Sequence, residues 1–159
     1  MNKEEPSNPL GYFLFERVCK NTRESKTMKQ LSIRTSTSTE MIDITDRIRI
    51  LAREKKIKDG ICHVFIPHTT AAVTINENAD PDVLRDILME LDKIVPLNDR
   101  YRHREGNSAA HIKASMMGAS EIVFIENGEL VLGTWQSVFF CEFDGPRTRT
   151  VIVKFVSLE

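Results

Sequence analysis

The sequence predicts an α+β fold with mainly antiparallel strands. Three observations support this class. Short β-branched runs recur along residues 29–156, three segments carry helix start or stop signals, and Asn127-Gly128 marks a hairpin late in the chain. Strands interrupted by helices, with hairpins late in the chain, are typical of α+β domains with an antiparallel sheet.

Eight short segments are predicted to be strands. They share β-branched or aromatic alternation, or an apolar run bounded by turn residues. In order, they are residues 29–37, 41–44, 61–67, 69–75, 121–126, 129–133, 136–143 and 148–156. Asn127-Gly128 is the dipeptide that closes a two-residue hairpin turn, and residues 144–146 separate the last two strands.

Three segments are predicted to be helices because capping residues precede them and Gly or Pro follows them. They are residues 46–58 after Thr45 and before Gly60, residues 81–94 after Asp80 with Pro81 in the first turn, and a shorter helix from Asn107 or Ser108 to Gly118. In the second of them, apolar residues keep helical spacing, at Leu84, Ile87, Leu88, Leu91 and Ile94.

The length of 159 residues fits one domain, expected at residues 28–159, with residues 1–27 as an N-terminal extension. A net charge of −1 gives no support for nucleic-acid or membrane-surface binding. The apolar runs are too short to cross a bilayer, and the first residues do not resemble a signal peptide. The three cysteines form no CxxC pair, which favours a reduced, cytoplasmic protein.

The segment YRHREGNSAAHIKA, residues 101–114, carries His103 and His111 eight residues apart. On one helix, that spacing is a rise of roughly 12 Å. Two nitrogens on one metal ion lie only about 3–3.5 Å apart. The Gly106-Asn107 break, however, allows the loop with His103 to fold back over the helix start with His111. The alternative is that both histidines are exposed polar residues of a loop.

A third histidine strengthens the prediction of a site. His68 follows the strand that Pro67 ends, where it can point into a cleft. Three histidines from separate segments match the ligand count of an open catalytic zinc site. His63 lies inside a strand and is expected to be an ordinary sheet residue.

Other polar residues are candidates for the same cleft. Glu77 and Asn78 follow one strand, and Gln136 and Glu142 lie on or beside apolar strands, where an unpaired side chain is costly. The RYRHR segment, residues 100–104, is either a solvated loop or a phosphate-binding edge beside His103. A Walker A motif, GxGxxG and GxSxG are absent from the sequence, which argues against an ATPase, a dinucleotide enzyme and the usual α/β-hydrolase.

Three segments together resemble the YjbQ family, whose function is uncharacterised and which is often labelled secondary thiamine-phosphate synthase. They are IPHTTAAVTINENADPDV at 66–83, YRH and EGNSAAHIKASMMG within 101–118, and LGTWQSVFFCEFDGPR at 132–147. The resemblance covers roughly residues 28–157 and leaves the extension outside. Ala109 and Ala110 depart from the polar residues that members often carry there, so no role is assigned to them.

The resemblance implies two packed sheets with flanking helices and a homotrimer around a threefold axis. It also implies a polar pocket near subunit contacts, with a divalent metal, zinc or substrate-bound magnesium. The implied metal ligands are His68, His103 and His111. The implied catalytic residues are Glu105, Asn107 and Gln136. The implied substrate-binding residues are Glu77, Asn78, Arg102, Arg104, Ser108 and Trp135.

The implied reaction joins a pyrimidine carried as a diphosphate to a thiazole phosphate and releases pyrophosphate. The departing diphosphate needs a metal and cationic or N–H donors. Arg102, Arg104 or the helix start at Ser108 would hold phosphate, and Glu105 would act as a base or orient a ligand. Two alternatives stay open: a metal-dependent hydrolase or lyase of another small metabolite, and a non-catalytic trimer that binds a metal or an anion.

Overall fold

The structure is a computed structural model that describes residues 28–158. The predicted extension 1–27 and the last residue lie outside the described residues. Every strand pairing is antiparallel, which confirms the predicted fold class. The strands are β1 Met28–Arg34, β2 Glu40–Asp43, β3 Gly60–Phe65, β4 Ala71–Glu77, β5 Ser120–Glu126, β6 Glu129–Leu130, β7 Gln136–Glu142 and β8 Thr148–Ser157. The helices are α2 Thr45–Lys55, α3 Pro81–Ile94 and α4 Ser108–Met117.

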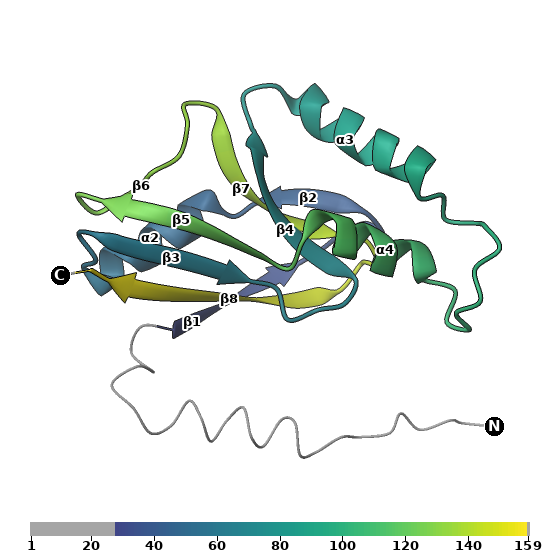
Figure 1. The fold of residues 1–159 in the computed structure, drawn as a ribbon, viewed down its shortest axis with the longest axis horizontal. Coiled ribbons are helices and arrows are strands. Elements are labelled where there is room, and N and C mark those ends of the chain that lie inside the picture. Colours follow the sequence, from purple (N-terminus) through teal and green to yellow (C-terminus); the bar gives the residue numbers. More distant parts are fainter. Residues whose placement is uncertain (1–27, 159) are drawn as a thin grey trace, which may run out of the picture.

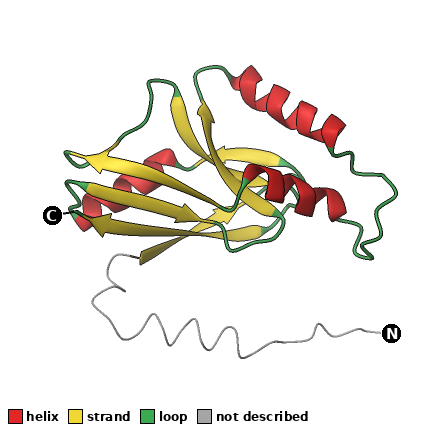
Figure 2. Ribbon diagram, in the orientation of Figure 1, coloured by secondary structure: helices red, strands yellow, loops and turns green. Residues whose placement is uncertain are grey.

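The strands form two sheets, which were implied by the resemblance. One has the order β1-β8-β3-β5-β6, and the other has the order β2-β7-β4 (Figure 1). β7 and β8 follow one another in the sequence but belong to different sheets, so the segment between them crosses from one layer to the other. Helix α4 lies against β4, and α2 lies behind the five-stranded sheet in the view of Figure 2.

Two hydrophobic clusters lie on opposite faces of the three-stranded sheet. The larger one fills the space between the sheets and α2, and includes Val138 and Phe140 of β7. The smaller one lies between the other face of that sheet and helices α3 and α4, and includes Phe139 and Cys141 of β7. Successive side chains of a strand point to opposite faces, so β7 contributes alternately to both clusters.

The caps of α3 agree with the sequence prediction. Asp80 accepts a hydrogen bond from the Asp82 N–H at 2.9 Å, and Pro81 occupies the first turn. The prediction that Thr45 caps α2 is wrong. The Thr45 N–H instead donates to the Asp43 side chain, and the Thr45 hydroxyl accepts from the Val138 N–H at 2.8 Å. Thr45 therefore ties the helix start to β7.

Gly60 opens β3 at a position where only glycine fits. A Cβ atom there would lie 2.3 Å from the backbone oxygen of Val156, which belongs to the neighbouring strand β8. The hairpin between β5 and β6 turns at Asn127 and Gly128, both with positive φ, as the sequence predicted. Within residues 28–158, no helix is long and apolar enough to cross a membrane.

Candidate functional site

The loop before α4 folds back so that His103 and His111 meet. Gly106 has a φ of 78°, a conformation that glycine adopts without strain, and its N–H donates to the His103 carbonyl at 3.2 Å. The two imidazole rings meet edge to face, with centroids 5.3 Å apart and an interplanar angle of 84°. The fold-back expected from the Gly106-Asn107 break is therefore present.

The distance between the rings suits two ligands of one ion. Two imidazoles on a tetrahedral zinc ion place their ring centres about 5 Å apart, given zinc–nitrogen bonds of about 2.1 Å. Glu105 also reaches this point, with Oε2 3.6 Å from Nε2 of His103. However, the described residues contain no group of three histidine, cysteine, aspartate or glutamate side chains placed to hold a metal. Metal binding at His103 and His111 stays a prediction, and one chain does not assemble the predicted three-histidine centre.

His111 lines two separate hollows on the surface. The first has a volume of about 350 Å³, and its other lining residues are Tyr101, His103, Ser108 and Ile112. The second has a volume of about 550 Å³, and its other lining residues are His68, Thr69, Ala71, Ala114, Ser115, Gly118 and Ala119. His68 and His103 therefore lie on different sides of His111, and each shares a hollow with it.

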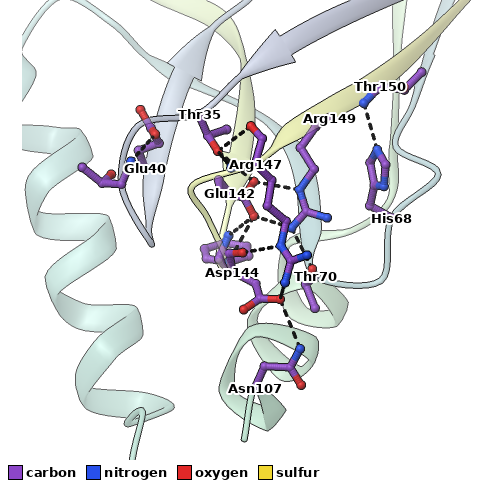
Figure 3. A network of polar contacts seen from close by, with 12 residues as sticks. Thr35, Glu40, His68, Thr70, Asn107, Glu142, Asp144, Arg147, Arg149 and Thr150 are labelled. Carbon is purple, nitrogen blue, oxygen red and sulfur yellow. Dashed lines mark hydrogen bonds and ion pairs between the residues drawn. The ribbon is translucent and has the colours of Figure 1, made fainter. Parts of the chain in front are cut away.

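His68 is half-buried and hydrogen-bonded to the five-stranded sheet. Its Nε2 accepts a hydrogen bond from the backbone N–H of Thr150, at 2.9 Å (Figure 3). Burial lowers the pKa of His68 below its ordinary value, and the positive charge of Arg149 lowers it further. The negative charge of Glu142 acts in the opposite direction but does not outweigh these effects. His68 is therefore held as a neutral ring.

A buried ion pair lies beside His68, between the two sheets. The Arg149 side chain donates to both carboxylate oxygens of Glu142, at 2.7 and 2.6 Å, and to the Thr70 hydroxyl at 2.9 Å. Glu142 also accepts from the N–H groups of Phe143 and Asp144. Sequence reasoning recognised that Glu142 needs a partner but did not identify Arg149.

Asn107 connects this network to the start of α4. Its side-chain N–H donates to Asp144 at 3.1 Å, and Asp144 in turn accepts from Arg147 at 2.7 Å. Asn107 therefore does not cap the helix with its side chain, and its buried Oδ1 has no hydrogen-bond partner among the described residues. The N–H groups of Ser108 and Ala109 precede the first intrahelical bond, which runs from the Ala110 N–H to the Asn107 carbonyl at 3.0 Å.

The remaining residues of the predicted site divide into two groups. Arg102, Arg104 and Glu105 are exposed in the loop before α4, close in sequence to His103.

The second group lies at the opposite end of the three-stranded sheet and consists of Glu77, Asn78, Trp135 and Gln136. Glu77 pairs with Gln136, whereas Ala71, beside the histidines, pairs with Glu142 six residues along the strand. At about 3.4 Å per residue, the two ends are roughly 20 Å apart. One chain does not bring these four residues to His111, and their place in the pocket stays a prediction.

Residues 29–158 match the sequence profile of the family described as UPF0047 protein YjbQ-like. The chain belongs to the YjbQ family. Among its YjbQ relatives, YugU of Bacillus subtilis is 52% identical over 130 residues, which are 81% of this chain and 98% of YugU. A UPF0047 protein of Methanocaldococcus jannaschii is 48% identical over 82% of this chain and 95% of its own length.

Solved YjbQ-type structures share the fold described above. A crystal structure from Clostridium acetobutylicum, of an uncharacterised conserved protein of the YjbQ/UPF0047 family, superposes with a TM-score of 0.79 at 55% identity. It covers 80% of this chain and 99% of its own. A protein of unknown function from Sulfolobus solfataricus has a TM-score of 0.79 at 32% identity, and covers 82% of this chain and 96% of its own.

Proposed function

We propose that this YjbQ-family protein is an enzyme that acts on a small phosphorylated metabolite around His111. The observation that carries the proposal is the position of His111, which lines both hollows, together with His103 in one and with His68 in the other. An imidazole titrates near neutral pH and can donate or accept a proton during a reaction. The hollows, about 350 and 550 Å³, match the size of small-molecule sites.

The start of α4 supports the phosphate part of the proposal. The N–H groups of Ser108 and Ala109 come before the first intrahelical bond, and the first turn contains no acidic residue that would repel an anion. Arg102 and Arg104 are exposed in the preceding loop, within a few residues of the helix start. Arginine side chains and helix N-termini both favour phosphate groups.

Thiamine-phosphate synthesis is the specific reaction that we propose to test first. In this reaction the C–O bond between the methylene carbon on the pyrimidine ring and the diphosphate breaks. The thiazole nitrogen forms a bond to that carbon, and pyrophosphate leaves. The α4 start and the two arginines would hold the departing diphosphate, which reduces the cost of its negative charge. Glu105, 3.6 Å from His103, would orient that ring or accept its proton.

As an alternative to proton transfer by His111, His103 and His111 would hold a zinc ion, or magnesium would enter with the substrate diphosphate. Either ion supplies charge neutralisation for a diphosphate. Metal analysis of the protein, purified without chelators, tests this part alone. We expect bound metal in the wild type and loss of it in His103→Ala and His111→Ala. Metal retained by both variants would remove these histidines as ligands.

The activity is tested with the two thiamine precursors, by measuring pyrophosphate release and product formation. We expect His111→Ala to lower the rate by roughly 100-fold or more, the range for loss of a general acid or base. Glu54→Gln, exposed on α2 and away from both hollows, is the control and should leave the rate unchanged. No product from the wild type would overturn the specific reaction, and an unchanged rate in His111→Ala would overturn the site.

The predicted homotrimer belongs to the same proposal, because the four residues at the other end of the three-stranded sheet can reach a histidine site only on another subunit. An apolar surface suits such a contact. It lies on the outer face of the five-stranded sheet and includes Phe65, Ile122, Phe124 and Val156, with 39–60% of each residue exposed. Exposed apolar patches of this kind mark interaction surfaces. Light scattering should give three times the chain mass, and a monomer at micromolar concentration would contradict the trimer.

A further inference from the structure

We propose that His68 is a fixed hydrogen-bond donor and not a metal ligand, and that its Nδ1–H binds an oxyanion in the hollow shared with His111. The oxyanion is a phosphate or a carboxylate group of the ligand. The identity of the ligand rests on the proposed function, whereas the assignment of the proton on His68 does not.

The reason begins where β3 leaves the five-stranded sheet. The pairing of β3 with β8 ends at Phe65, which lies opposite Ile152. Two residues further on, the chain reaches Pro67 and turns away, so the N–H of Thr150 has no strand to pair with on this side. The ring of His68 takes that place, with Nε2 at 2.9 Å from the Thr150 nitrogen. The imidazole thus completes the edge of the sheet.

This hydrogen bond fixes the position of the proton on the ring. A neutral imidazole has one lone pair and one N–H. Because Nε2 of His68 uses its lone pair to accept from Thr150, the proton must be on Nδ1. Nδ1 has no acceptor in the part of the chain that the structure describes, so this N–H is available to a ligand. A metal would need the lone pair that Thr150 already occupies.

The surroundings of His68 favour a neutral donor. Arg149 is only 7% exposed and is held by Glu142, and its positive charge disfavours a second cation nearby. The hollow of about 550 Å³ is lined by histidine, threonine, serine, alanine and glycine, and none of its lining residues is acidic. A ligand oxygen that accepts from His68 therefore meets no carboxylate there, and the Thr69 and His111 side chains lie within the same hollow.

The first experiment measures the proton position directly. In the wild-type protein labelled with ¹⁵N-histidine, two-bond ¹H–¹⁵N correlation spectra distinguish the two neutral forms of each ring. We expect His68 to carry its proton on Nδ1, and His68→Gln identifies its signals by their disappearance. A proton on Nε2 would overturn the inference, whatever the outcome of the activity assays.

The second experiment measures binding of inorganic phosphate, and separately of acetate, by calorimetry. His68→Leu removes the donor, and we expect it to weaken binding roughly tenfold or more, the value of one hydrogen bond to a charged group. His68→Gln offers both an acceptor for Thr150 and a donor for the ligand, and should recover part of the affinity. Glu54→Gln, exposed on α2 and away from both hollows, is the control and should bind like the wild type.

The outcomes separate the two proposals. If phosphate binds through His68 but the protein forms no product from any phosphorylated substrate, the proposed enzyme activity is refuted and the oxyanion site is supported. Equal affinity in His68→Leu and the wild type would refute the oxyanion site. Zinc binding that is lost in His68→Leu but retained in His68→Gln supports a structural role for the ring, whereas zinc binding lost in both would show His68 to be a ligand and overturn the inference.

Discussion

Arg149 and Glu142 form an ion pair of two hydrogen bonds, at 2.7 and 2.6 Å, between the two sheets. Both residues are buried, with exposed fractions of 7% and 0%. A charge in such a place is tolerated only when it is paired and its remaining polar atoms are satisfied. Thr70 and Thr35 complete the hydrogen bonding, and Thr70 lies two residues after His68. The pair therefore connects the stability of the core to the position of a site residue.

Removal of one member of this pair should destabilise the fold strongly. Arg149→Met leaves the Glu142 carboxylate buried and unpaired, so we expect a loss of about 3–5 kcal/mol in the free energy of unfolding. The double variant Arg149→Met with Glu142→Leu should be more stable than Arg149→Met alone, because no charge is left uncompensated. Urea unfolding of the three proteins measures both effects.

The exposed ion pair of Arg53 and Glu129 is the control for that experiment. Its side chains are 64% and 57% exposed, and the N–O distance is 2.7 Å. Surface pairs contribute about 0–1 kcal/mol, so Arg53→Met should have little effect on unfolding. Equal losses in Arg53→Met and Arg149→Met would show that burial of the Arg149 pair has no energetic consequence.

Gly106→Ala should separate the two histidines of the loop. With a φ of 78°, Gly106 adopts a conformation that is strained for alanine, although a Cβ atom would meet nothing within 4 Å. We expect a loss of stability of about 1 kcal/mol or more and a weaker nuclear Overhauser effect between the rings of His103 and His111. Gly128→Ala, in the hairpin turn with a φ of 82°, should lose stability but keep the ring contact. An unchanged ring contact in Gly106→Ala would show that the glycine does not position His103.

The two cysteines of the described chain should be unreactive in the native protein. Burial raises the pKa of Cys62 and that of Cys141 to about 12, and the thiolate is the reactive form. At pH 8, iodoacetamide should therefore label neither residue until the protein is unfolded, as followed by peptide mass spectrometry. Labelling of either one at the rate seen in urea would contradict the buried placement.

The contribution of His68 to stability should depend on pH in a defined direction. Its pKa in the folded protein is lowered, so the unfolded chain binds a proton first as the pH falls. Stability from the neutral ring is fully present above the unfolded pKa of about 6.5 and is lost as the pH falls toward the folded pKa. The difference in unfolding free energy between wild type and His68→Gln should therefore shrink from pH 7.5 to pH 5. A difference that grows over this range would contradict a neutral His68.

Local signals in the sequence were sufficient for most of the elements. Asp80 and Pro81 predict the start of α3, and Asn127-Gly128 predicts the turn between β5 and β6, because each acts on its own neighbours. The prediction that Thr45 caps α2 is wrong because the partner of its side chain is distant in the sequence. Thr45 has the right side chain for a cap, but its hydroxyl binds the Val138 N–H of a strand 93 residues away.

The site was predictable only in part, because some of its contacts join residues that are distant in the sequence. The glycine break that lets His103 approach His111 is visible in the sequence, since both residues lie within one short segment. The partner of His68 is the Thr150 backbone, 82 residues away, and no pattern in the chain indicates that pairing. Arg149 did carry a signal, because it occupies the alternation of inward-facing residues in β8 that continues at Val151 and Val153.

The alternation of β7 has a consequence for how the protein unfolds. Phe139 and Phe140 are neighbours in the chain, yet one belongs to the cluster under α3 and α4 and the other to the cluster between the sheets. If β7 separates from one cluster, the apolar residues of the other cluster are exposed to water as well. Helix packing and sheet packing are therefore expected to melt as one cooperative unit, with the helical and the strand signals of circular dichroism following the same transition.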